Sequence, residues 1–210
     1  MWNYVTIFEN AIKGIVGAPY GVATDCCTHA IFISLLWEKE HGLEEVGLPT
    51  KTYISVPQTC RHLGFKIRYY DKSWKGAYNI IGSDTVDSAC HFSENTYIEG
   101  HHHCLSFQHR KTLSTIRGGM ILTDNKSFAD WARLMIYDGR DKNKMMAFDK
   151  PTLCGYHYYM PPETAILGLE NLCKLKGFKH EPIATDEDYD DVSHWVGLNG
   201  ELHLVLMMVH

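Results

Sequence analysis

A chain of 210 residues, 45% of them apolar, is long enough for one substantial hydrophobic core, and this composition excludes a disordered protein. The net charge of −5 argues against a general nucleic-acid-binding surface, and no apolar run approaches the roughly 20 residues that a membrane-spanning helix needs. The seven cysteines are scattered without a C-x-x-C pair and the N-terminal segment does not read as a secretory signal, which favours a cytoplasmic protein with reduced thiols.

The N-terminal half alternates between helix and strand patterns. Apolar residues at helical spacing precede Gly17, and residues 20–24 fit a short apolar strand. Small polar residues then lead into a segment that is apolar on most sides and ends before Gly42. This segment predicts a strand–turn–helix unit with a buried helix, followed by three more strands at 46–48, 66–70 and 85–89.

The next part of the chain continues the alternation. Strands are predicted at 104–107 and 120–123. The run from Ser127 to Asp130 fits a capping box that opens a helix, and Pro161-Pro162 can begin another that continues to the lysines before Gly177. Strands alternating with helices predict an α/β fold with a mostly parallel sheet.

The C-terminal segment differs in composition. An acidic run occupies residues 186–191, and SHWVGL-NG-ELHLVLMMV fits a hairpin turned by Asn199-Gly200. We therefore predict one main domain over residues 1–177, followed by an acidic linker and a β-hairpin tail over 178–210.

Three single residues could carry chemistry, and each also has a simpler explanation. Thr28 lies where a strand runs straight into a helix, which is a natural phosphate site but also a common place for a helix cap. Asp87 lies in an apolar run that reads as interior, where a carboxylate needs a partner, or it faces solvent at a strand end. Lys111 follows a strand, and most lysines in such a place are solvated.

The run His101-His102-His103 could suggest a metal site. Adjacent residues on an extended chain point to opposite sides, so three in a row rarely converge on one ion. We interpret the run as a polar loop and predict no metal ion.

The order of these features resembles that of a pyridoxal-phosphate enzyme. Such a site needs a lysine that forms a Schiff base, a carboxylate that keeps the pyridine nitrogen protonated, and a cradle for the phosphate. A phosphate-type turn, a buried Asp after a strand and a lysine after a Ser-Phe strand end follow one another in that pattern.

More specifically, the chain resembles the DegT/DnrJ/EryC1/StrS family of sugar-nucleotide aminotransferases. SFQHRKTLSTIRGGMILTDN is similar to the family's lysine segment and DCCTHAIFISLL to its phosphate turn; three more similar segments are EVGLPTKTYISV, TVDSAC and GYHYYMPPETAILGLENL. The resemblance runs from about Phe8 to Leu175. It implies an aspartate aminotransferase-like large domain of fold type I, with three α/β/α layers and a truncated C-terminal domain.

The resemblance also implies roles for individual residues. Lys111 falls on the lysine that forms the Schiff base, Asp87 on the partner of the pyridine nitrogen, and Tyr53 on an aromatic residue that stacks on the ring. Cys90 stands where a His or Gln usually contacts the cofactor.

The phosphate contacts are implied in the same way. Thr28, with His29 beside it, falls in the phosphate turn, and Ser106 falls on a serine that binds the cofactor phosphate. His157 stands where an Asn reaches the phosphate of the neighbouring subunit.

Two segments are shorter than the family pattern. Only fifteen residues separate Asp71 from Asp87, where relatives have a further strand and helices, and an acidic tail follows Leu175 in place of the C-terminal domain. In addition, Asp25 and Cys26-Cys27 replace the family's Asn-Ser-Gly.

The resemblance implies an aminotransferase that moves an amino group, with glutamate as the expected donor, to a nucleotide-linked keto-sugar in amino-sugar or polysaccharide biosynthesis. It implies a cytoplasmic homodimer without a nucleic-acid or membrane partner. A pyridoxal-phosphate-dependent sugar dehydratase is one alternative, although that branch replaces the lysine by histidine. A non-catalytic binding or interaction module is the other, favoured by the missing segments.

Overall fold

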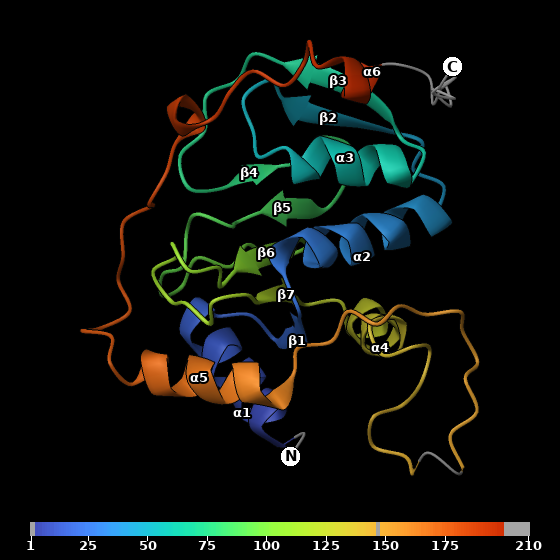
Figure 1. The fold of residues 1–210 in the computed structure, drawn as a ribbon, viewed down its shortest axis with the longest axis vertical. Helices are drawn as coiled ribbons and strands as arrows, with labels where there is room; N and C mark the ends of the chain where they lie inside the picture. The colour runs from blue at the N-terminus through green and yellow to red at the C-terminus, as the bar shows by residue number, and fades with distance from the viewer. Residues whose placement is uncertain (1–2, 146–147, 200–210) are drawn as a thin grey trace, which may run out of the picture.

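The structure is a computed structural model that describes residues 3–145 and 148–199. Its strands form the middle of the molecule and its helices lie on both sides (Figure 1). The strands are β1 Tyr20–Thr24, β2 Glu45–Pro49, β3 Lys66–Tyr70, β4 Tyr78–Asn79, β5 Thr85–Asp87, β6 His102–Ser106 and β7 Gly119–Thr123. The helices are α1 Asn3–Val16, α2 Cys27–Glu40, α3 Ser55–His62, α4 Lys126–Met135, α5 Pro162–Leu172 and α6 Val196–Asn199, with a 3-10 turn at Asp186–Asp188.

The sheet is mixed, so the prediction of a mostly parallel sheet is wrong. Five strands have the order β1-β7-β6-β5-β4, in which only β5 and β6 run parallel, and β2 and β3 form a separate parallel pair. The cause lies in the connections. The segments between β4 and β5 and between β6 and β7 contain no helix that could carry the chain back across the sheet, and so each pair turns antiparallel.

The short strand β4 closes the distance between the two groups of strands. Beyond it, Ile81 exchanges two backbone hydrogen bonds of 2.9 Å with Gly47 of β2. A Cβ at position 47 would lie 2.5 Å from the Tyr70 ring and 3.0 Å from Ile81, so any larger residue there would displace the exposed Tyr70 ring. Strand β4 was not predicted from the sequence. It lies between Asp71 and Asp87, in the stretch that is shorter than the family pattern.

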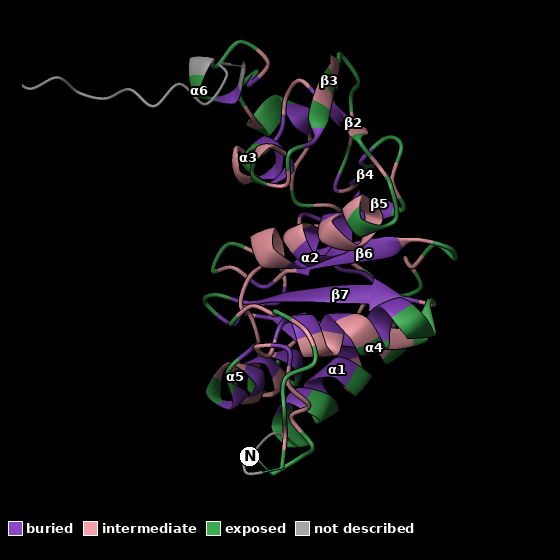
Figure 2. Cartoon of the chain, turned by 90° about the vertical axis from the view of Figure 1, so that its right-hand side faces the viewer, coloured by how far each residue is buried: buried purple, intermediate pink, exposed green. Residues whose placement is uncertain are grey.

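Two cores lie on opposite faces of the sheet, as expected for three α/β/α layers. Alternate residues of the central strands point to each face: Cys104 and Ile121 join the core under α2, α3 and α4, whereas Leu105 and Met120 join the core under α1 and α5. Figure 2 shows that β6 and β7 are buried between these layers. In the described parts of the chain, no helix is long and apolar enough to cross a membrane.

Most predicted elements are confirmed, with differences at helix ends. Helix α4 is capped by Asn125, whose side chain accepts from the Phe128 N–H at 3.0 Å, so the capping box at Ser127 is wrong. Helix α5 ends at Leu172, before the lysines that the sequence included in it, and buries Ala165 and Gly168.

The C-terminal tail also differs from the prediction. Helix α6 occupies residues where the first hairpin strand was predicted, because Leu198 is buried and bonds back to the carbonyl of Trp195 within one turn. The remainder of the predicted hairpin lies outside the described residues, and the division at residue 177 stays a prediction.

The prediction that the run His101-His102-His103 forms a polar loop is wrong for its second and third residues. His102 and His103 belong to β6 and are buried, rather than forming a loop, although they do point to opposite sides. His102 stacks on Phe128 with 3.9 Å between ring centroids and bonds Thr123 at 2.9 Å, whereas His103 meets Ser88 at 3.3 Å. Burial lowers the pKa of both rings to about 4, so they are neutral at pH 7.

This burial predicts a loss of stability in weak acid. A histidine whose folded pKa is about 4 and whose unfolded pKa is near 6.5 binds more protons when unfolded, so the free energy of unfolding falls as pH drops below 6.5. Between pH 7 and pH 5, His102 should account for a loss of about 2 kcal/mol. Urea denaturation of His102→Phe should show a smaller loss than the parent chain. The exposed His109→Ala is the control and should lose as much as the parent; an unchanged His102→Phe profile would contradict the prediction.

Candidate active site

A cavity of about 760 Å³ opens where helix α2 begins and strands β5 and β6 end. Its wall combines the first turn of α2, the start of α3, the connection from β6 to β7, and two segments around Trp74 and Tyr189. Six of the eight site residues predicted from the sequence line it: Thr28, Tyr53, Asp87, Cys90, Ser106 and Lys111.

One end of the cavity suits an anion. Helix α2 starts after Cys26, which adopts an extended conformation and makes no side-chain cap, so the first N–H groups of the helix are left for a ligand. Hydroxyl groups lie beside this turn: Thr28 Oγ1 contacts Ser55 Oγ at 2.9 Å. The alternative that Thr28 caps the helix fails, because the N-cap residue is Cys26.

The close approach of β7 brings Ser106 to the same turn. Gly119 pairs with Ser106 across the β6–β7 ladder, and a Cβ at position 119 would lie only 2.4 Å from the Cys26 carbonyl carbon and 2.5 Å from the Cys27 nitrogen. Glycine is therefore required at this position. This contact explains why Gly119, the second glycine of the lysine segment SFQHRKTLSTIRGGMILTDN, cannot carry a side chain.

Asp87 lies at the end of β5 and is 6% exposed. Its Oδ1 accepts from the Ala89 N–H at 2.9 Å, and its Oδ2 accepts from the Tyr78 hydroxyl at 3.0 Å. The Tyr78 hydroxyl in turn contacts Thr52 Oγ1 at 2.5 Å. Burial raises the pKa of Asp87, and the two hydrogen bonds and the nearby charge of Lys111 partly offset this effect.

The sequence left open whether Lys111 is a solvated surface lysine or a residue of the site. It is half-buried and reaches into the cavity, where its Nζ donates to Cys90 Sγ at 3.2 Å. Cys90 is 4% exposed, and its sulfur also contacts the Tyr189 hydroxyl at 3.3 Å. The amine, the thiol and the phenol therefore form one contiguous group on the cavity wall.

The acidic tail contributes the outer wall, which sequence analysis missed. The Ile183 N–H donates to the Cys90 carbonyl and the Gly76 N–H to the Ala184 carbonyl, both at 2.9 Å. These bonds carry Tyr189 over the cavity, where it packs against Trp74 at 5.3 Å between ring centroids. Tyr78, Trp74 and Tyr189 were not predicted, because none of them lies in the segments whose motifs resemble the family.

Two predicted residues, His29 and His157, do not line this cavity in the described structure. His29 stacks on Tyr158 at 3.6 Å and bonds Asp25 at 2.6 Å. Burial would lower the pKa of His29, but its bonds to Asp25 and Cys26 outweigh this effect and raise the pKa to about 9. Asp25 also pairs with Arg117 at 2.9 Å, so these side chains mainly hold the turn together.

His157 lies on the surface. Its side chain is 69% exposed and pairs with Asp138 at 2.9 Å. The role that the sequence predicted for it, across a subunit interface, stays a prediction.

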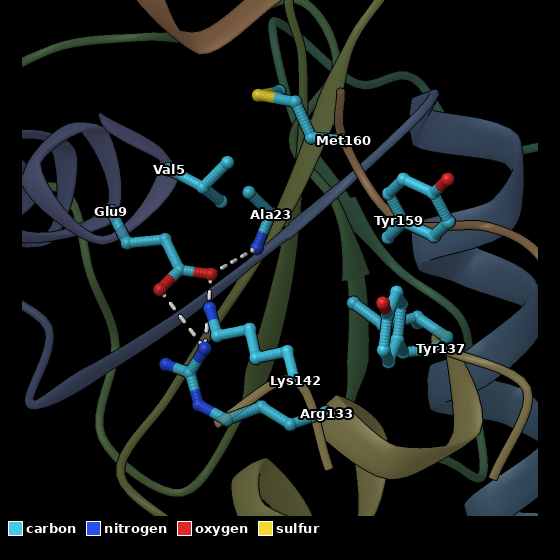
Figure 3. Close-up of a pocket in the computed structure, with 9 residues that line it drawn as sticks. Val5, Glu9, Ala23, Arg133, Tyr137, Lys142, Tyr159 and Met160 are labelled. Atoms are coloured by element: carbon cyan, nitrogen blue, oxygen red, sulfur yellow. Dashed lines mark hydrogen bonds and ion pairs between the residues drawn. The ribbon is translucent and has the colours of Figure 1, made fainter. Parts of the chain in front are cut away.

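A second, much smaller space of about 20 Å³ surrounds the buried Glu9 (Figure 3). Arg133 Nη1 donates to both Glu9 oxygens at 3.0 and 2.9 Å, and the Ala23 N–H donates to Glu9 at 2.9 Å. The space holds a water molecule at most. We assign it a structural role, because the ion pair joins α1, β1 and α4.

Several solved structures share this fold. The chain superposes on the sugar aminotransferase CalS13 from Micromonospora echinospora with a TM-score of 0.69 and 16% identity, covering 81% of this chain and 60% of that one. AtS13 from Actinomadura melliaura gives a TM-score of 0.71 with 18% identity and coverage of 80% and 59%. PseC of Helicobacter pylori, an aminotransferase involved in the biosynthesis of pseudoaminic acid, gives 0.69 with 16% identity and coverage of 81% and 57%.

The fold is thus that of sugar aminotransferases, of whose length the chain spans about 60%. The model of the DegT/DnrJ/EryC1/StrS aminotransferase family matches residues 1–81 and 98–191, and the chain belongs to this family. The matched parts include Lys111, Ser106 and Thr28 but not residues 82–97, where Asp87 and Cys90 lie. Among curated proteins, none matches the sequence significantly.

The bond from Tyr78 to Asp87 can be tested by Tyr78→Phe. Loss of one donor to a buried carboxylate should lower the free energy of unfolding at pH 7 by about 1–3 kcal/mol. The raised pKa of Asp87 would rise further, so the deficit should shrink as the pH approaches 4 and the carboxyl group takes up a proton.

Tyr69→Phe is the matched control for urea denaturation at both pH values. The Tyr69 hydroxyl is buried without a hydrogen-bond partner, so its removal should leave stability unchanged or increased. Equal losses in the two variants, or a deficit for Tyr78→Phe that does not depend on pH, would contradict the assignment.

Proposed function

We propose that this chain is a pyridoxal-phosphate-dependent aminotransferase that transfers an amino group, with glutamate as donor, to a nucleotide-linked keto-sugar. One observation carries the proposal: Lys111 and the buried Asp87 line the same cavity as the uncapped start of α2. Family membership supports it, since the family is one of pyridoxal-phosphate-dependent sugar aminotransferases.

The residues present fit this cofactor. The N–H groups of α2, with the hydroxyls of Thr28 and Ser106, suit the phosphate, and the Gly119 contact leaves the turn free of a side chain that would fill it. Asp87 suits the ring nitrogen, because each carboxylate oxygen can accept more than the one bond it already receives. Tyr53, which lines the cavity, suits the ring face.

When bound, the cofactor supplies an electron sink for the carbon that gains or loses the amino group. Asp87 would hold the proton on the ring nitrogen and be kept ionised by the charge that it faces, which offsets the effect of burial. The Lys111 amine, reaching in beside Cys90, would move the proton at the reacting carbon. Trp74 and Tyr189, on the outer wall, would exclude water.

The substrate class rests on relatives. DesI was crystallised in the presence of its TDP-sugar product, and the chain shares its fold with a TM-score of 0.60 at 18% identity. For this chain, the Arg110 cation on the cavity wall would suit the diphosphate of a nucleotide sugar. We further propose a cytoplasmic homodimer in which the exposed His157 reaches the neighbouring subunit's site.

A non-catalytic binding module is the second candidate. The favouring observation is the length: the chain covers only 60% or less of the aminotransferase structures described above. The dehydratase alternative is disfavoured by the presence of Lys111.

The proposal predicts covalent capture of the cofactor. Purified protein mixed with pyridoxal phosphate should turn yellow, and borohydride should fix the cofactor to the peptide that contains Lys111, as seen by mass spectrometry. Lys111→Ala should lose both signals, because no other amine is placed to replace it on this wall among the described residues. The exposed Lys72→Ala is the matched control and should retain them. A colourless, unlabelled protein would favour the binding module.

Activity is tested separately. Nucleotide-linked keto-sugars should be aminated with glutamate at a rate that Lys111→Ala lowers by at least about 1,000-fold, comparable to losses on removing other nucleophiles. Retained turnover in Lys111→Ala would rule out the assigned role. Cofactor capture without turnover on any such sugar would leave the cofactor site and remove the proposed substrate.

A further inference from the structure

The contact between Lys111 and Cys90 joins two nucleophiles on the wall of an open cavity. Their Nζ and Sγ atoms are 3.2 Å apart, and the Tyr189 hydroxyl approaches the same sulfur at 3.3 Å. Both residues line the 760 Å³ cavity, so a small oxidant can reach the sulfur although Cys90 itself is 4% exposed. We propose that Cys90 and Lys111 form a reversible sulfur–nitrogen cross-link under peroxide.

The chemistry balances with hydrogen peroxide as the oxidant. Peroxide transfers one oxygen to the Cys90 thiol, which becomes a sulfenic acid, while the other oxygen leaves as water; sulfur loses two electrons and the peroxide bond takes them. The unprotonated amine of Lys111 then attacks the sulfur. The N–S bond forms and the S–O bond breaks, and the departing hydroxide takes the proton from nitrogen and leaves as water.

The neighbouring atoms favour this product over others. A sulfenic acid usually condenses with a second thiol or a backbone nitrogen. At Cys90 the atom already in contact is a side-chain amine. The thiols of Cys60 and Cys104 are buried, and the half-buried Cys27, which also lines the cavity, donates to the Cys104 carbonyl at 3.4 Å. Desolvation raises the pKa of all three thiols and disfavours the reactive thiolate, so they are poor competitors.

Cys26 distinguishes a specific reaction from general thiol oxidation. It lines the same cavity, but its side chain contacts the His29 ring and the Arg117 guanidinium rather than a primary amine. Peroxide reaching the cavity should therefore oxidise both cysteines, yet cross-link only Cys90 to Lys111.

The cross-link would remove the Lys111 amine from the cavity. A thiol reductant would restore it by attacking the sulfur, forming a mixed disulfide and releasing the amine. The cross-link itself does not depend on the proposed function. One expectation does rest on it: pyridoxal phosphate bound to Lys111 should prevent the cross-link.

The test is peptide mass spectrometry of the full chain after peroxide treatment without cofactor. The expected result is a joined pair of peptides carrying Cys90 and Lys111, two hydrogens lighter than their sum, which dithiothreitol separates. Cys26→Ser, the matched control, should form the pair as the parent does, and Cys90→Ser should not.

Lys111→Arg keeps the positive charge but lacks the nucleophilic amine, and it keeps the inference testable if Cys90→Ser misfolds. Peroxide should leave Cys90 as a sulfenic acid that dimedone traps, with several-fold more label than in the parent. Cys90 that stays unmodified, or is found only as a disulfide or higher oxide in the parent, would overturn the proposal. Cross-linking that pyridoxal phosphate does not prevent would instead count against the proposed function and leave this inference standing.

Discussion

The buried carboxylate of Asp87 is the constraint that the site depends on. A charge at 6% exposure is costly unless donors face it, and here the donors are a backbone N–H and the Tyr78 hydroxyl. Tyr78 is itself buried, and Thr52 completes the chain of hydroxyls behind it. The carboxylate is thus held at the cavity by groups of the fold, without an ion-paired side chain in contact with it among the described residues.

The short segment around β4 explains how the shortened chain keeps its two groups of strands together. The stretch between β3 and β5 is brief, yet β4 and Ile81 span the distance to β2, and the Tyr78 ring contributes to the larger core. The same segment supplies the Tyr78 hydroxyl that donates to Asp87. One short stretch therefore serves both packing and the site.

The sequence predicted the parts of the structure that depend on local patterns. Strand β1 was predicted at its observed bounds, and Thr28, Asp87 and Lys111, which the order of the motifs indicated, line one cavity. Strand direction was not predictable in the same way, because apolar runs carry no sign of which neighbour they pair with. His102 and His103 show a second limit of prediction from local patterns. A run of polar residues suggested a loop, but both rings are buried in a strand, where they contact aromatic and hydroxyl groups.

The parts of the site that were missed come from contacts distant in sequence. Tyr189 meets Cys90 across 99 positions, and nothing in the local sequence of either residue marks the other as its neighbour. Composition predicted an acidic linker after residue 177, and backbone hydrogen bonds at Ile183 and Ala184 hold that segment against the domain.

The position of this outer wall in the chain has a consequence for biogenesis. Lys111 and Asp87 leave the ribosome well before residues 182–189, and domains begin to form from their N-terminal parts during synthesis. The nascent protein therefore passes through a stage in which Lys111 and Cys90 lack the cover of Tyr189, which residues 182–189 add later in synthesis.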